Sequence, residues 1–155
     1  MKTILAAVDS SGMSAAVVAE AAELARATGG RVVLLTVVEP PVITSEYAPM
    51  IENIAEITAA SEKAAERHLS HLRSRLRDED IVGESIALSG APVVEILAKA
   101  TEHGADYIVM GSHGHTAFYD LLVGSTTHGV MRRASCPVVI VPPPKKEPKP
   151  RKSKK

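Results

Sequence analysis

Two glycine-containing segments near the end of the chain have residue types suited to binding phosphate. Gly111 and Gly114 lack Cβ atoms, so the backbone there is free to take positive φ and to approach a phosphate or ribose closely. Further on, Gly124 precedes three hydroxyl residues where a helix is expected to begin, namely Ser125, Thr126 and Thr127. The first amides of a helix are unpaired and its dipole favours an anion, and the hydroxyls add donors there. Together these segments predict a cradle for a triphosphate.

The elements that must position this cradle alternate along the chain. Continuous apolar runs predict strands at residues 3–8, 31–38, 107–110 and 138–141, and an alternating, more polar run at 81–88 predicts another strand nearer an edge. Apolar residues at helical spacing predict helices over 14–28, 51–76 and 92–103 and from about 125. Ser14 is expected to cap the first helix, and the apolar stripe of the second is interpreted as core packing.

Strands that alternate with helices imply right-handed crossovers and a parallel sheet. The predicted fold class is therefore α/β, an open, doubly wound, five-stranded parallel sheet with helices on both faces. In such a sheet, ligands bind beyond the carboxyl ends of the strands, where the strand order reverses. Three of these ends are polar or glycine-rich, at residues 9–12, 37–39 and 111–114.

The composition favours a single globular domain. The chain has 155 residues, of which 45% are hydrophobic but only 3% aromatic, so the core has to be built from Ala, Val, Ile and Leu. We expect this domain to span residues 1–142. Residues 143–155 are rich in Pro, Lys and Arg and cannot bury apolar surface, which predicts a disordered basic tail.

Charge and cysteine content exclude several classes of function. The formal net charge is +0; without its basic tail the domain is mildly acidic, so nucleic-acid binding by the domain is not expected. A single cysteine, Cys136, excludes an intramolecular disulfide. No apolar stretch is long enough to span a membrane, so we expect a cytoplasmic protein without membrane contact.

The spacing of the glycines resembles a known signature. Gly111, two residues, Gly114, nine residues and then Gly124-Ser125 are similar to the ATP-binding motif of the universal stress protein family. The resemblance extends to Ala7-Val8-Asp9 after the first strand and to the apolar, proline-flanked segment at residues 135–142. It implies a Rossmann-like fold that binds ATP and Mg²⁺.

The resemblance also implies which residues form the site. Ala7, Val8 and Asp9 would lie beside the nucleotide, with the Asp9 carboxylate available to nucleotide or magnesium. Val37 would border the adenine. The ribose and phosphates would be held by Met110, Gly111, His113 and Gly114 and by Gly124, Ser125, Thr126 and Thr127. Family members commonly dimerise through the last strand, which implies a homodimer through Val138 to Val141.

The chain also departs from a simple ATP-binding interpretation. Gly129 lies inside the last expected helix, at a cost of about 1 kcal/mol relative to alanine, and Asp120 places negative charge between the motif glycines. No P-loop or dinucleotide motif is present, so hydrolysis is expected to be slow at most. The alternative is a protein-interaction module of the same fold that does not use nucleotide. Zinc binding by the histidines is not favoured, since cysteine or carboxylate partners are missing at suitable spacing.

Overall fold

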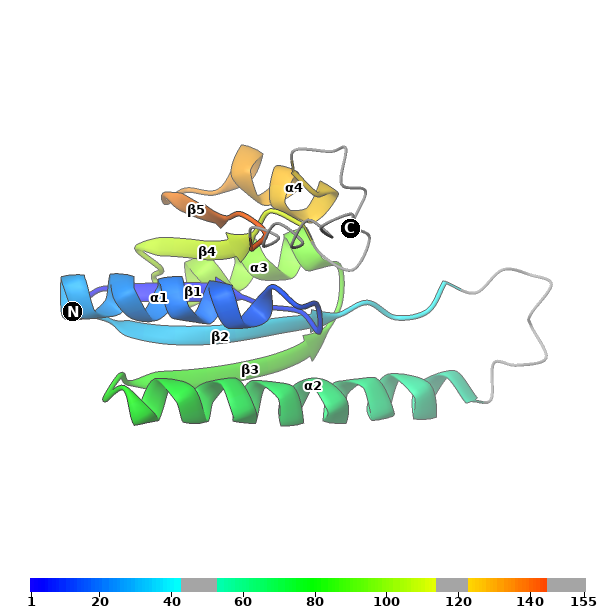
Figure 1. Ribbon diagram of the computed structural model, residues 1–155. Helices are drawn as coiled ribbons and strands as arrows, with labels where there is room; N and C mark the ends of the chain where they lie inside the picture. The colour runs from blue at the N-terminus through cyan, green and yellow to red at the C-terminus, as the bar shows by residue number, and fades with distance from the viewer. Residues whose placement is uncertain (43–52, 114–122, 145–155) are drawn as a thin grey trace, which may run out of the picture.

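The computed structural model describes residues 1–42, 53–113 and 123–144, and within them five strands and four helices alternate along the chain (Figure 1). The strands are β1 (Thr3–Ala7), β2 (Arg31–Val38), β3 (Gly83–Ser89), β4 (Tyr107–Gly111) and β5 (Val138–Val141). The helices are α1 (Ser14–Thr28), α2 (Ile54–Asp78), α3 (Pro92–Glu102) and α4 (Ser125–Arg133). All strand pairs are parallel, in the order β3-β2-β1-β4-β5. The predicted fold class is confirmed.

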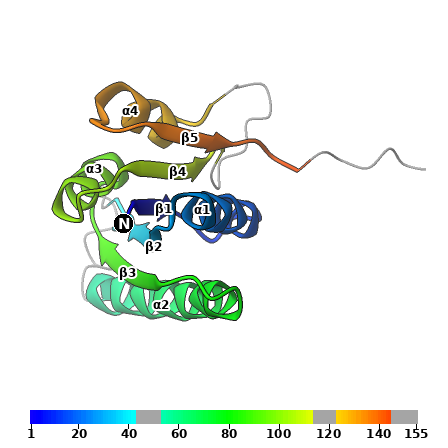
Figure 2. The ribbon, with the colours of Figure 1, turned by 90° about the vertical axis from the view of Figure 1, so that its left-hand side faces the viewer.

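The helices cover both faces of the sheet, as expected for a doubly wound fold. One core cluster joins α1 and α2 to the sheet side chains of Ile4, Ala6 and Leu34. The other joins α3 and α4 to the opposite face, which includes Leu5 and Val33. Figure 2 shows α1 and α3 on opposite sides of β1. Because β1 has neighbours on both edges and helices on both faces, Ile4, Leu5 and Ala6 are fully buried, which explains its unbroken apolar run.

The polar, alternating strand lies where its composition predicts. β3 is at one edge of the sheet, paired only with β2 among the described strands, and its side chains are mostly half-buried. Several predictions fall on residues outside the described part of the chain. These are the first turn expected for the second helix at residue 51, Gly114 and Asp120, and all but the first two residues of the predicted tail.

Ser14 does not cap α1 as predicted. Its Oγ donates to the carbonyl oxygen of Asp9 and, at 3.3 Å, to that of Ser11, whereas a capping hydroxyl accepts from an amide further on. Met13 occupies the N-cap position without a side-chain cap bond. The cause is the turn after β1: Oδ1 of Asp9 accepts the amide hydrogen of Ser11 at 2.8 Å. This turn directs two carbonyl groups at the start of the helix, and the Ser14 hydroxyl satisfies them.

Charged contacts hold the amino-terminal edge of the sheet, at the opposite end from the glycine segments. Nζ of Lys2 lies 2.8 Å from Oδ1 of Asp106, and the amide of Thr3 donates to Oδ2 at 2.8 Å. The hydrogen bond from Lys2, followed by that from the Thr3 amide, holds the pKa of the Asp106 carboxyl below its usual range. These contacts join the start of β1 to the residue that precedes β4.

Gly129 has a packing role that its sequence context does not reveal. A Cβ atom built on Gly129 would lie 2.8 Å from Cγ2 of Val93 and 3.3 Å from its Cγ1. Val93 belongs to α3, which packs against α4. The expected helix cost of this glycine is therefore offset by the close approach of the two helices.

We predict that Gly129→Ala lowers the free energy of unfolding by about 1 kcal/mol, because overpacking costs roughly 1–3 kcal/mol while alanine adds about 1 kcal/mol of helix propensity. Urea denaturation followed by circular dichroism measures the change. In a Val93→Ala background, the same substitution is expected to stabilise the protein, since the clashing methyl groups are gone. A stabilising Gly129→Ala in the unsubstituted protein would contradict this packing.

Candidate functional site

A cleft of about 570 Å³ opens at the carboxyl ends of β1, β2 and β4. This is the place where the strand order reverses and where ligands bind in open parallel sheets. Every predicted site residue that the structure describes lines this cleft; they are Ala7, Val8, Asp9, Val37, Met110, Gly111, His113, Gly124, Ser125, Thr126 and Thr127. Gly114, the remaining predicted residue, lies outside the described part of the chain.

The end of β1 is fixed to β2 beneath the cleft. The amide of Val8 donates to the carbonyl of Leu35 at 2.9 Å, and Oγ1 of Thr36 donates to the carbonyl of Val8 at 2.9 Å. These bonds extend the contact between the two strands beyond their last paired residues, Ala7 and Leu35. They hold Asp9, the next residue, at the mouth of the cleft, where one of its carboxylate oxygens already closes the turn to Ser11.

The end of β4 brings backbone close to the cleft at Gly111. A Cβ on this residue would lie 3.3 Å from the Met13 side chain and 3.3 Å from the carbonyl oxygen of His113, tighter than ordinary van der Waals contact. The neighbouring Ser112 is 5% exposed, and its amide donates to the carbonyl of Val141 at 2.9 Å. Its Oγ lies 2.9 Å from Nδ1 of His113. The segment therefore has little freedom to change shape.

The start of α4 is held against this segment. The amide of Gly124 donates to the carbonyl of Ser112 at 2.7 Å, and the first backbone bond within the helix runs from His128 to Gly124 at 2.9 Å. The amides of residues 125–127 precede that bond and have no partner within the helix, as at any helix start. They face a cleft that their own residues line, which gives it the partial positive charge of a helix N-terminus.

Thr127 lines the cleft but does not offer the donor that the sequence suggests. Its Oγ1 donates to the carbonyl of Gly111 at 2.8 Å, and the residue is only 3% exposed. Its hydroxyl proton therefore joins α4 to the end of β4. The hydroxyls of Ser125 and Thr126, which are more exposed, remain as the donors beside the helix start.

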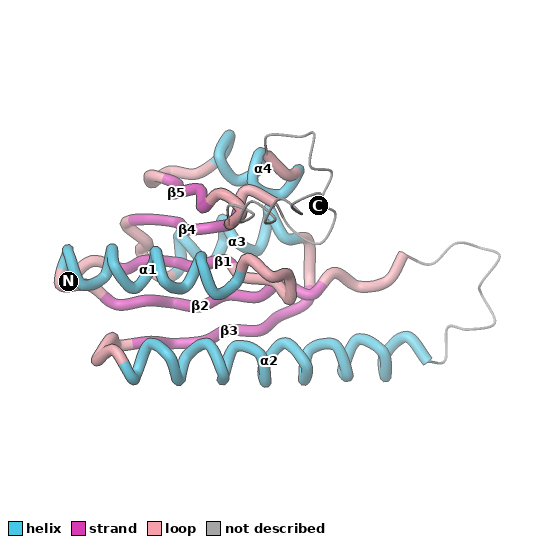
Figure 3. The backbone as a smooth tube through the Cα atoms, viewed as in Figure 1, coloured by secondary structure: helices cyan, strands magenta, loops and turns pink. Residues whose placement is uncertain are grey.

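One wall of the cleft was missed by reasoning from sequence. It comes from α2, whose first half extends past the carboxyl ends of the strands (Figure 3). Four residues of this helix, spaced by three, four and seven positions, line the cleft: Ser61, Ala64, Ala65 and His68. Small residues one turn apart were the available signal, but they do not differ from an ordinary core stripe. Nε2 of His68 is buried there without a hydrogen-bond partner in the described part of the chain.

The described lining of the cleft contains no lysine or arginine, and its acidic residues are Asp9 and Glu39. No group of three or more His, Cys, Asp or Glu side chains among the described residues is placed to hold a metal ion. Positive character in the lining thus comes from backbone amides. An anion with several charges would therefore need a counter-cation in this cleft, and Asp9 and Glu39 are the carboxylates of the described lining.

Comparison with known proteins decides the family. A family model described as the universal stress protein family matches residues 1–142. The chain belongs to this family. Among curated relatives of this universal stress protein, YxiE of Bacillus subtilis is 31% identical over 144 residues, covering 89% of this chain and 97% of the relative.

Solved structures of the family share the fold. Universal stress protein UspA from Lactobacillus plantarum superimposes with a TM-score of 0.80 at 26% identity, covering 90% of this chain and 97% of that chain. The universal stress protein from Archaeoglobus fulgidus in complex with dAMP has a TM-score of 0.60 at 26% identity, covering 90% of this chain and 96% of that chain.

Within the described residues of this chain, no helix is both long and apolar enough to cross a membrane.

We predict that Thr127→Val lowers the free energy of unfolding by about 1–2 kcal/mol, because a buried carbonyl loses its hydroxyl donor while the side-chain shape is kept. Thermal or urea unfolding measures the change. Thr126→Val is the matched control, with an expected effect within about 0.5 kcal/mol, since that side chain is more exposed. Equal losses in the two variants would contradict the structural role of the Thr127 hydroxyl.

Proposed function

We propose that this universal stress protein binds ATP together with Mg²⁺ in the cleft and acts in stress response or signalling. The observation that carries the proposal is the meeting of the start of α4, whose first amides have no partner within the helix, with the close-packed Gly111 backbone in one cleft. A volume of about 570 Å³ is within the range of small-molecule and cofactor sites. The dAMP complex of a relative supports an adenine nucleotide as the ligand class.

The two ends of the cleft suit the two ends of a nucleotide. Gly111 and Gly124 allow close approach of the backbone, and Ser125 and Thr126 offer amides and hydroxyls, which suit phosphate oxygens. Val37 and Val38 at the end of β2, with small residues of α2, offer apolar surface that suits a flat base. We therefore expect phosphates beside α4 and the adenine between β2 and α2, with Ala7, Val8, Met110 and His113 between them.

Mg²⁺ fits the residues present. Magnesium is usually held by one or two carboxylates together with nucleotide phosphates, and Asp9 supplies one carboxylate at the cleft. When bound, the ion supplies positive charge that the described lining lacks. The residues of the chain bind and orient the nucleotide, and we expect at most slow hydrolysis, which phosphate release measured during ATP binding experiments checks.

We predict that Ser125→Asp weakens ATP binding by at least about tenfold, because the new carboxylate lies at the proposed phosphate position. Folding should not suffer, since a negative charge in the first turn of a helix is favourable. Calorimetric titration with ATP and Mg²⁺ measures the affinity, after mass spectrometry has established that no nucleotide co-purifies. Ser125→Ala is the control, with a loss of a few-fold at most.

Failure of nucleotide-free protein to bind ATP would overturn the proposal. The alternative, a cytoplasmic interaction module that keeps the fold without using nucleotide, would then be favoured.

We further propose a homodimer formed through β5. This strand ends the sheet, its four apolar residues are all only half-buried, and the described part of the chain pairs it on one side alone. An apolar edge strand of this kind is suited to pairing with a second copy. The packing of Val139 and Val141 on one core cluster and of Val138 on the other leaves Ile140 as the residue to substitute.

We predict that Ile140→Lys converts the dimer to a monomer, because pairing would bring two lysines together at the shared edge. Size-exclusion chromatography with light scattering measures the mass. Val82→Lys, at a residue that is 66% exposed beside the opposite edge strand, is expected to leave the dimer intact. A monomeric unsubstituted protein, or a dimer unaffected by Ile140→Lys, would refute this interface.

A further inference from the structure

His68 has a buried ring nitrogen that the fold does not satisfy. Its Nε2 is inaccessible to solvent, and no described residue hydrogen-bonds to it. Buried polar atoms in proteins are nearly always paired, because leaving one unpaired costs the full desolvation of that atom. Because solvent does not reach this atom in the structure, a molecule bound in the cleft completes its hydrogen bonding only when the imidazole ring turns toward the cleft.

The surroundings of His68 on α2 leave room for a flat group. Ser61, Ala64 and Ala65 precede it on the same helix face, and all three have small side chains. Beyond it on the helix, the lining gives way to the core residues Leu69, Leu72 and Leu76. His68 thus lies at the inner end of a shallow, largely apolar wall.

Neighbouring hydroxyls in the lining do not compete for the same partner. Oγ1 of Thr36 donates to the carbonyl of Val8, and Oγ of Ser14 donates to carbonyls of the turn after β1. Both side chains line the cleft, and both have already directed their protons to the backbone. Nε2 of His68 is the buried side-chain polar atom of this wall that remains for a ligand, among the described residues.

The position of α2 decides which part of a ligand this atom meets. α2 packs on β2 and β3, whereas the helix start proposed to hold phosphates belongs to α4, on the other side of β1. The geometry points to His68 as a specificity-determining residue: its Nε2 hydrogen-bonds the edge of the purine base of the bound nucleotide. This inference rests on the proposed function and extends it to the base end of the cleft.

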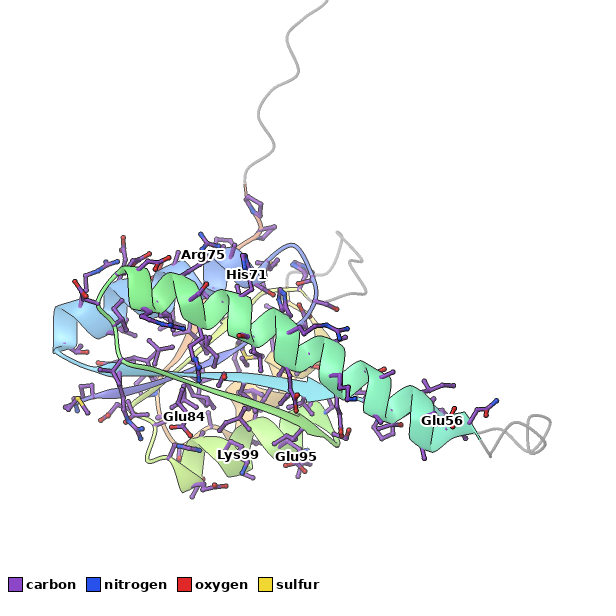
Figure 4. All side chains as sticks on the ribbon, turned by 90° about the horizontal axis from the view of Figure 1, so that it is seen from below. Glu56, His71, Arg75, Glu84, Glu95 and Lys99 are labelled. Carbon is purple, nitrogen blue, oxygen red and sulfur yellow. The ribbon has the colours of Figure 1, made fainter. Side chains whose placement is uncertain are left out.

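A matched residue for the experiment lies one turn further along α2. Figure 4 labels His71, an exposed residue of the same helix, together with Arg75 and, at the far end of the helix, Glu56. His71→Leu removes an imidazole ring from an exposed position that does not line the cleft. His68→Gln keeps a polar atom near the position of Nε2, whereas His68→Leu replaces it with an apolar group of similar size.

The test titrates the full-length protein and these variants with ATP and, separately, with inorganic tripolyphosphate. His68→Leu is expected to weaken ATP about tenfold, the loss of roughly one hydrogen bond, and to leave tripolyphosphate affinity unchanged. The melting temperature of nucleotide-free His68→Leu is expected to rise, because an unpaired buried atom has been removed. His68→Gln and His71→Leu are expected to bind ATP within about threefold of the unsubstituted protein.

Each other outcome is decisive. Unchanged ATP affinity in His68→Leu, or equal weakening of ATP and tripolyphosphate, would overturn the role of His68 while leaving ATP binding intact. An equal loss in His71→Leu would overturn it as well. Failure of the unsubstituted protein to bind ATP would instead overturn the proposed function and this inference together.

Discussion

The structure depends on the position of β1 between β2 and β4. The chain passes from β1 through β2 to β3 in one direction and then returns across β1 to β4 and β5. Because such crossovers are right-handed, this reversal places α1 and α2 on one face and α3 and α4 on the other. The connections that follow β1 and β4 therefore leave in opposite directions. The cleft is the space that they leave open at the carboxyl ends of these two strands.

Hydrogen bonds around the end of β4 give this opening a fixed shape. The carbonyl of Ser112 accepts the Gly124 amide, and the carbonyl of Gly111 accepts the Thr127 hydroxyl. Both contacts join residues on either side of segment 114–122, which the structure does not describe. The groups used in these bonds belong to the scaffold, whereas the first amides of α4 have no partner within the helix. A helix start held in this way has its donors in fixed positions, which is the arrangement that anion sites in proteins use.

Much of the fold and of the cleft was predictable because it depends on the local spacing of residue types in the sequence. The strands follow from unbroken apolar runs such as residues 3–8, and the cleft residues from glycines at strand ends. What could not be predicted depends on partners far away in the sequence. Gly129 is explained by Val93, and the Ser14 hydroxyl is taken by the turn at Asp9. His68 belongs to an ordinary helical pattern, and only the fold shows that its ring reaches the cleft.

The overhang of α2 divides the cleft into two parts with different freedom to change. At 25 residues the helix is about 37 Å long, yet its buried leucines all lie in its second half. The first half projects beyond the ends of the strands (Figure 1). Its inner face forms one wall of the cleft. Substitutions along that face reshape the wall without disturbing the sheet or the start of α4. The fold thus separates the fixed helix start at one end of the cleft from an adjustable surface on α2, so that the shape of the cleft can change through substitutions on one helix.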